Sequence, residues 1–524
     1  MTESVEDRRW LILAVLCVAV LLVGVDNTIV NVALPTLSEQ LRATNTDLQW
    51  IVDGYSLPFA GLLLMGGGLA DRFGRKRIMQ SALLFFGLFS FLAARSHTIE
   101  ELLTARALMG AAAAFIFPAT LSIVTTTFKD PSQRAKAFGV WGATAGVSIA
   151  VGPIVGGELI THFWYGSIFL VNIPIVFFAF LACALIVPES RSPLQGRFDV
   201  NGLTLGTAFV TLLVLAIIQG PEWGWRSFST LGLFAVSGVL LCSFVLYELR
   251  RTGPLLDVRV FSNRAFSAGA SAIATSFFCL FGFIFLVTQY FQLIHGYSAL
   301  QAGVRTLPFA VVTMFITPLG AIAALRVGTR YVVSAGLVIM GIALFWMTYI
   351  GAHAAYVGPI MGSMVVLAFG FSLINAPSTA AIMGSLRPDQ IGAGAAVNET
   401  TREIGGTMGV AVVGSVFSSL FGPAVRHAFA HLGLSRTQLD IAQSSTQAAK
   451  AVVAHVPLGL PLHQALESGV VSSFIDGFHR GCLVAACAAI VVGVVAYRFL
   501  PLRVARQDQF VHGREEIRVL DTPG

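Results

Sequence analysis

The chain has 524 residues, of which 56% are hydrophobic and 11% are charged, and its mean hydropathy is +0.79. A soluble domain has about 25% charged residues, so this composition excludes a soluble protein and predicts a polytopic membrane protein. The net charge of +6 does not indicate nucleic-acid binding here, because the basic residues cluster in the connections between apolar runs.

Apolar runs of roughly 18 to 25 residues, the length of a bilayer crossing, recur along the chain. The first run follows Arg8 and Arg9 but continues to about Ala33 without a small-residue cleavage site, so we interpret it as a retained span and not as a signal peptide. We predict an all-α polytopic membrane protein with fourteen transmembrane spans, at 10–34, 50–70, 78–95, 102–124, 137–160, 167–187, 200–219, 229–248, 266–291, 302–324, 331–350, 356–380, 393–420 and 475–498.

The loops between these spans predict the orientation and the plan of the chain. With both termini in the cytoplasm, most of the 33 Lys and Arg residues lie on the inside, as the positive-inside rule requires. We divide the chain into an amino-terminal six-helix bundle at 1–187, two additional transmembrane helices with linkers at 188–255, a carboxy-terminal six-helix bundle at 256–500 and a cytoplasmic tail at 501–524. A long extracellular loop with amphipathic stretches is predicted at 421–474. Secondary transporters are commonly built from such repeats, with the substrate site between the halves.

A glycine-rich run lies in the fifth predicted span. We expect the helix to bend at Pro153, and we expect Gly142, Gly146 and, less regularly, the later glycines to lie on one side of the helix, where another helix can pack closely. Tight helix packing is one explanation of this pattern and a conformational role is the other. The residues of the motif are Gly142, Gly146, Gly152, Pro153, Gly156 and Gly157.

The turn after the second span reads Asp71-Arg72-Phe73-Gly74-Arg75-Lys76-Arg77. Gly74 permits a tight bend, and Asp71 can pair with an arginine or with a helix amino terminus. Anchoring of the cytoplasmic side explains the positive charges by itself. The order of the residues, with Asp71, Gly74 and Arg75, is more specific than anchoring requires, and the resemblance described below implies that these three form a second conformational motif.

Three ionisable residues lie in the outer half of the first bundle, so they could meet: Asp26, Asp53 and Arg106. An acid inside the bilayer costs about 2.5 to 3.5 kcal/mol on insertion scales and therefore faces a bundle interior or a cavity. A nearby arginine favours the charged carboxylate and loss of water favours the neutral one, so protonation could change with conformation. The alternatives are a satisfied ion pair for Asp26, an acid hydrated at a cavity mouth for Asp53, and an arginine paired with carbonyls for Arg106.

The thirteenth span adds two acids, Glu399 and Glu403, which lie on one face of a helix because they are four residues apart. Arg402 can pair with Glu399, and we favour this internal pair as the role of Glu399. Glu403 lies close to the midplane by helix rise and is the second candidate, after Asp26, for cation binding or protonation.

Motifs that would indicate an enzyme or an ATP-driven transporter are missing from the sequence. No phosphate-binding GxxxxGK[ST] loop occurs, which argues against ATP-driven transport by this chain. No serine elbow or metal cluster emerges, and the six cysteines lie in apolar segments without CxxC spacing. We therefore expect no enzyme activity, no catalytic residue, no metal and no cofactor.

Several of these segments resemble one family, and they do so in the same order along the chain. The glycine run resembles the antiporter motif of drug exporters in the major facilitator superfamily, and the turn at Asp71–Arg77 resembles the motif that latches their outward-facing state. The segment Val25–Pro35 resembles the first-helix signature of the fourteen-span drug:H+ antiporters. The segment around Arg106 resembles their fourth-helix arginine signature.

This resemblance implies a proton-coupled multidrug efflux antiporter that exports amphipathic, mainly cationic drugs by alternating access. It implies proton coupling or cation recognition by Asp26 and proton transfer by Arg106, whereas acids at Asp53 and in the thirteenth span vary among such exporters. The expected partners are small-molecule drugs, protons and the lipid bilayer, with a proton gradient in place of a cofactor, no nucleic acid and a monomeric state. The expected location is the bacterial inner (plasma) membrane. Export of an endogenous metabolite, antibiotic or lipid, and a membrane sensor without transport, remain alternatives.

Overall fold

The computed structural model describes residues 3–41, 45–191, 199–251, 258–386, 390–430, 432, 434–455 and 461–502. These parts of the chain are mainly helical and contain no strand. By length and composition, 13 candidate membrane spans occur among them. The helix α2 (Asn45–Phe73) is not one of the thirteen, but its 29 residues make it the fourteenth segment of spanning length. The all-α fold class predicted from sequence is confirmed.

The amino-terminal bundle contains α2 and the helices α1 (Glu3–Leu41), α3 (Arg75–Ala94), α4 (Ile99–Thr127), α5 (Pro131–His162), α6 (Ser167–Leu170) and α7 (Asn172–Ile186). Capping residues explain where several of these helices begin. The side chain of Thr98 accepts a hydrogen bond from the N–H of Glu101, and that of Asp130 accepts one from Gln133. The predicted span at 167–187 consists of two helices in series, because α6 ends at Leu170 and α7 begins at Asn172.

Two additional helices, α8 (Val200–Trp223) and α9 (Phe228–Arg250), lie between the bundles in sequence. α8 packs on α2 and on α15 (Ile391–Phe429), whereas α9 packs mainly on α8. The indole N–H of Trp225 donates to the Ser415 hydroxyl at 2.8 Å, which ties the turn between the two helices to α15. The predicted domain boundaries stay predictions, and the linker residues 192–198 and 252–257 and the tail at 503–524 lie outside the described residues.

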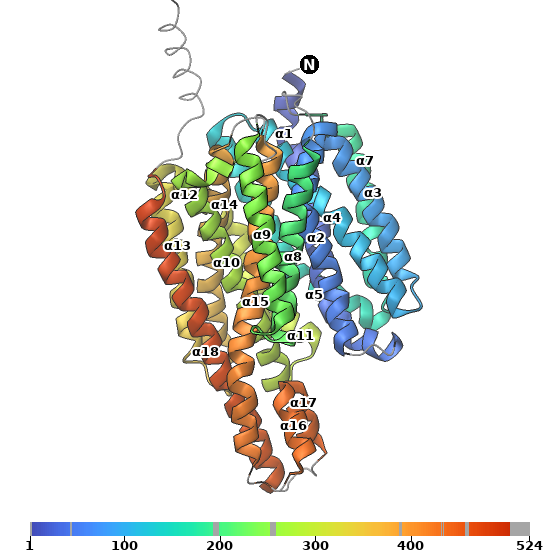
Figure 1. Cartoon of the computed structure of the whole chain (residues 1–524), viewed down its shortest axis with the longest axis vertical. Coiled ribbons are helices and arrows are strands. Elements are labelled where there is room, and N and C mark those ends of the chain that lie inside the picture. The colour runs from blue at the N-terminus through green and yellow to red at the C-terminus, as the bar shows by residue number, and fades with distance from the viewer. Residues whose placement is uncertain are drawn as a thin grey trace, which may run out of the picture.

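The carboxy-terminal bundle contains α15 and the helices α10 (Arg264–Gln289), α11 (Ala299–Arg305), α12 (Leu307–Val327), α13 (Thr329–Met347), α14 (Met361–Gly384) and α18 (Pro461–Phe499). Short turns join or precede them: η1 (Val258–Ser262), η2 (Tyr290–Ile294) and η3 (Tyr356–Ile360). The amino-terminal end of α1 and the carboxy-terminal end of α18 lie at the same end of the molecule (Figure 1). We call this end the terminal face and the opposite end the distal face.

The segment 421–474 is largely helical, which corrects the prediction of a long loop. α15 continues to Phe429 and α18 begins at Pro461, and the short helices α16 (Arg436–Ser444) and α17 (Thr446–Ala454) lie between them. These helices project beyond the rest of the molecule at the distal face (Figure 1). Counting apolar residues ends a span where polar residues begin, but here the helices continue because Val425, Phe429 and Leu466 are buried among them.

Buried side chains form two hydrophobic clusters, and the boundary between them shows how the bundles meet. One cluster fills the amino-terminal bundle and the other extends along the carboxy-terminal bundle, from Val333 and Leu500 to Phe429. The ends of α10, α14 and α15 at the terminal face belong to the first cluster, through Phe266, Ile382 and Ile391. The two bundles are therefore closed against each other at the terminal face.

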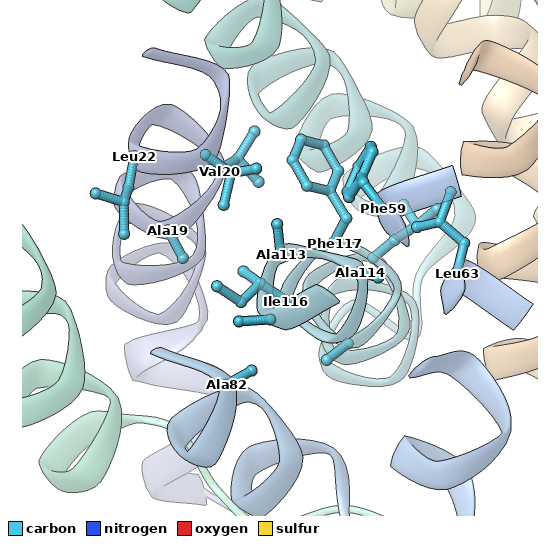
Figure 2. Packing of buried hydrophobic residues seen from close by; sticks show 14 of the residues in the cluster. Ala19, Val20, Leu22, Phe59, Leu63, Ala82, Ala113, Ala114, Ile116 and Phe117 are labelled. Carbon is cyan, nitrogen blue, oxygen red and sulfur yellow. The ribbon is translucent and has the colours of Figure 1, made fainter. Parts of the chain in front are cut away.

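The amino-terminal cluster is built around α4. Figure 2 shows Ala113, Ile116 and Phe117 of α4 between side chains from α1, α2 and α3. Phe117 meets Phe59 of α2 edge-to-face, with ring centroids 5.8 Å apart. The many alanines allow the helix backbones to approach closely, so that a buried polar group in this bundle has no room for bulk water.

Candidate functional site

Asp26 and Arg106 form an ion pair in the distal half of the amino-terminal bundle. Arg106 Nη1 donates to Asp26 Oδ2 at 2.8 Å, and both side chains are fully buried. Asn172, at the start of α7, donates from Nδ2 to Asp26 Oδ1 at 2.7 Å, and Arg106 Nε donates to the carbonyl of Ile51 at 3.1 Å. The predicted meeting of Asp26 and Arg106 is confirmed, and in this conformation Asp26 is sealed from solvent.

Tyr55 of α2 continues this cluster toward the other bundle. Its ring lies under the guanidinium of Arg106, with Cζ 4.3 Å from the ring centroid. Among the described residues, the buried Tyr55 hydroxyl and Arg106 Nη2 have no hydrogen-bond partner. The contacts of Asp26 and Arg106 do not include Asp53, which is half-buried. The structure thus brings together two of the three predicted residues.

Glu399 and Arg402 form a second buried pair, within α15. Arg402 Nε lies 3.6 Å from Glu399 Oε1, and both side chains are buried. Asn398 donates to the same carboxylate oxygen at 2.8 Å, and Arg402 Nη2 donates to the Thr379 hydroxyl at 3.1 Å. The internal pair favoured from sequence is therefore present. Arg402 also reaches the other bundle, with Cζ 4.8 Å from the ring centroid of Trp141 on α5.

Glu403 differs from the other intramembrane acids. It lies inside the molecule one helical turn beyond Glu399, and the residue as a whole is half-buried. Among the described residues, its carboxylate makes no hydrogen bond or ion pair, and it is near enough to Tyr55 in the other bundle for an electrostatic interaction.

The turn between α2 and α3 locks the terminal face. Asp71 Oδ1 accepts from Arg75 Nη2 at 2.6 Å, and Asp71 Oδ2 accepts from the backbone N–H of Gly392 in the first turn of α15 at 2.7 Å. Gly74 has φ of 110°, a conformation that favours glycine. Both pairings proposed for Asp71 from sequence are present. The bond to Gly392 connects the two bundles, and the pair with Arg75 holds the Asp71 carboxylate in place for it.

Some glycines of the α5 run face α11 and α12 and others face α1, which corrects the prediction that they share one side of the helix. A Cβ on Gly146 would lie 2.2 Å from Thr313 Cγ2 of α12, and one on Gly157 would lie 3.1 Å from Leu300 of α11. Gly152 and Gly156 instead face Thr28 and Ile29, so these two glycines allow α1 to pack closely on α5. Gly142 has ordinary space, at 3.5 Å from Thr317. Pro153 lies within the helix, against Gly303.

Sequence reasoning missed Asn172, Trp141 and Glu189. Glu189 accepts from the N–H groups of Lys76 and Arg77 at the start of α3. Asn172 could have been identified from sequence, because it lies in an apolar segment and a buried amide needs hydrogen-bond partners. Trp141 and Glu189 carried no such signal, because their partners are distant in sequence.

Two helical bundles of membrane-spanning length meet, with buried ion pairs in each bundle and one acid between them that has no ion-pair partner among the described residues. No group of His, Cys, Asp and Glu in the described parts of the chain could hold a metal. This arrangement is that of a multi-pass membrane transporter. The chain belongs to the Major Facilitator Superfamily, whose sequence profile matches residues 16–410.

Related proteins match nearly the whole chain. The chain is 36% identical over 501 residues to the multidrug efflux pump LfrA of Mycolicibacterium smegmatis, covering 95% of this chain and 98% of that protein. It is 32% identical to the methyl viologen resistance protein SmvA of Salmonella typhimurium, covering 85% and 89% of the two chains. It is 31% identical to the tetracenomycin C resistance and export protein of Streptomyces glaucescens, covering 94% and 92%.

A solved structure supports the fold. The crystal structure of the human organic anion transporter MFSD10 matches with a TM-score of 0.61 and 14% identity, covering 94% of this chain and 99% of the other. At this identity the likeness concerns the fold alone. The superfamily profile and the relatives named above indicate that the chain is a transporter of this superfamily.

Proposed function

We propose that the chain is a proton-coupled exporter of amphipathic, mainly cationic drugs that works by alternating access. The similarity to LfrA over 95% of the chain supports drug export. The carboxylate of Glu403, which has no ion-pair partner among the described residues and faces Tyr55 of the other bundle, is the observation that carries proton coupling. An intramembrane acid without a partner can take up and release a proton without breaking an ion pair, whereas Asp26 cannot.

In this proposal Glu403 has the proton-coupling role that was predicted first for Asp26. Asp26 is fully buried and held by Arg106 and Asn172, so uptake of a proton in this conformation would have to break that pair. In our proposal, Glu403 is protonated from the distal side and the cargo leaves there. The bundles then reopen at the terminal face, where Glu403 loses its proton. Asp26 and Arg106 position Tyr55 opposite Glu403.

The same scheme sets the location. We place the chain in the inner (plasma) membrane of a bacterium, with the terminal face in the cytoplasm. The proposal follows the distribution of Lys and Arg residues in the sequence. In this orientation the conformation described above is closed to the cytoplasm, and proton uptake occurs from outside.

The test is transport by purified protein in proteoliposomes. Methyl viologen, a permanent organic dication, is the cargo, and a pH-sensitive dye in the lumen reports proton movement. Wild-type protein should move methyl viologen against protons when a pH gradient is imposed. The E403Q variant should lose at least about tenfold in gradient-driven rate, equivalent to about 1.4 kcal/mol of activation free energy.

The control is E158Q. Glu158 lies at the distal end of α5, with 66% of its side chain exposed, and pairs only with His162 on the same helix at 3.2 Å. Its neutralisation removes the same charge from the chain without touching the bundle interface, so the rate should stay unchanged. Gradient-driven export by E403Q at the wild-type rate would exclude Glu403 from proton coupling.

A further inference from the structure

The guanidinium of Arg402 lies between two aromatic rings that belong to different bundles. Its Cζ is 4.8 Å from the ring centroid of Trp141 on α5 and 5.3 Å from that of Phe277 on α10. Trp141 is fully buried and Arg402 is 5% exposed. An organic cation is recognised by this same chemistry, because the faces of aromatic rings attract positive charge.

The acid required to complete such a site is also present. Glu399 Oε1 lies 3.6 Å from Arg402 Nε, and Glu403 follows one turn later on α15. Arg402 Nε nevertheless has no hydrogen-bond partner among the described residues, because its separation from Glu399 is too long for one. The aromatic faces and the acid therefore hold this internal cation without satisfying all its donors.

The site is assembled from both bundles and depends on their closure. The Trp141 indole N–H donates to the Thr120 hydroxyl of α4 at 3.2 Å, and its ring meets Phe117 of α4 edge-to-face. These contacts hold the indole in the amino-terminal bundle, whereas Phe277, Glu399 and Arg402 belong to the other one. Opening at the terminal face would therefore withdraw Trp141 from Arg402.

We propose that Phe277 and Glu399, joined by Trp141 as the bundles close, form a subsite for planar organic cations, and that Arg402 is an internal competitor that occupies it when the terminal face is closed. The proposal rests on the proposed export function and deepens it. When the terminal face opens, Arg402 loses the Trp141 face and can be displaced from Glu399 by a cationic cargo. When the face closes, Arg402 returns between the two rings and expels the cargo toward the distal side.

The test compares two ligands of the same shape and different charge. Methyl viologen is a dication, and its parent 4,4′-bipyridine is neutral at pH 7. Equilibrium binding of each is measured on detergent-purified protein, without any gradient. R402Q should bind methyl viologen about tenfold more tightly than wild type does, with no change for 4,4′-bipyridine. In transport, the same variant should lower both KM and the maximal rate, because cargo release becomes slow.

Additional variants separate this mechanism from a structural role of Arg402. R402Q/E399Q should lose the gain in methyl viologen binding, because the acid that the competitor released is gone. W141L made in the R402Q background should weaken methyl viologen binding about fivefold, since one aromatic face is removed from the cargo. R402K retains the charge without the planar face, and should give an intermediate tightening of about threefold.

The proposal is overturned if R402Q and R402K bind methyl viologen no more tightly than wild type, or if 4,4′-bipyridine gains equally. If R402Q does not purify as a monodisperse protein, R402K alone tests the proposal. Gradient-driven export by wild type without tighter binding by these variants would refute the subsite and leave the proposed function standing. Tighter, charge-selective binding by R402Q without any export by wild type would refute the proposed function and leave the subsite standing.

Discussion

Replacement of Arg106 by methionine tests the buried ion pair. R106M leaves the Asp26 carboxylate at zero exposure with Asn172 as its remaining side-chain donor. Removing one partner of a buried pair costs about 3 to 5 kcal/mol, because the other charge is left without compensation. We expect about 3 kcal/mol here, the lower end, since the Asn172 hydrogen bond persists.

The measurement is unfolding of purified protein by titration with a denaturing detergent, followed by circular dichroism. The double variant D26L/R106M removes both charges, and buried pairs replaced by apolar residues are often as stable as the original. It should therefore be more stable than R106M alone, by about 1 to 3 kcal/mol. R95M, at an exposed arginine at the end of α3, is the control and should change stability by less than about 0.5 kcal/mol. A loss below about 1 kcal/mol for R106M, or no recovery in the double variant, would refute this reasoning.

Three further predictions concern packing and closure. G146V should destabilise the protein by about 1 to 3 kcal/mol through a clash with Thr313, whereas G142A, which has ordinary space, should unfold like wild type in the same titration. D71N keeps the size of the side chain but weakens its bond to Gly392 across the terminal face and its pair with Arg75. Cysteines introduced at the terminal face should then react with a polar maleimide several-fold faster, which corresponds to about 1 kcal/mol. An unchanged reaction rate would contradict the role of Asp71 in closing this face. Y55F removes a hydroxyl that has no partner among the described residues, and should cost less than about 0.5 kcal/mol; a larger loss would mean that the hydroxyl is bonded in the folded protein.

The sequence predicted those parts of the fold that depend on local composition. Apolar length located the spans, and the turn at Gly74 and both pairings of Asp71 followed from residue chemistry. The segment 421–474 could not be predicted in this way. Its polar residues suggested a loop, although Ser435 begins a capped helix and Phe429 is buried by tertiary packing.

The candidate site was predictable only in part, for a similar reason. Helix rise placed Asp26 and Arg106 at one depth, but depth does not specify which helix face a residue occupies. For the same reason the contact of Asn172 with Asp26 was not predicted, and the glycines of α5 were predicted to share one side of the helix. The contact between Trp141 and Arg402 joins segments separated by about half of the chain, and no local pattern marks it.

The shared hydrophobic cluster at the terminal face affects the energetics of the whole carrier. Phe266, Ile382 and Ile391 would be wetted each time the halves part there, at about 25 cal/mol for every Å² of apolar surface exposed. Under the proposed alternating access, this cost favours the shut form of the unloaded carrier on that side. A ligand that binds the parted form more tightly than the shut form would shift this balance, so the side chains that fold the protein would also limit leakage through an empty carrier.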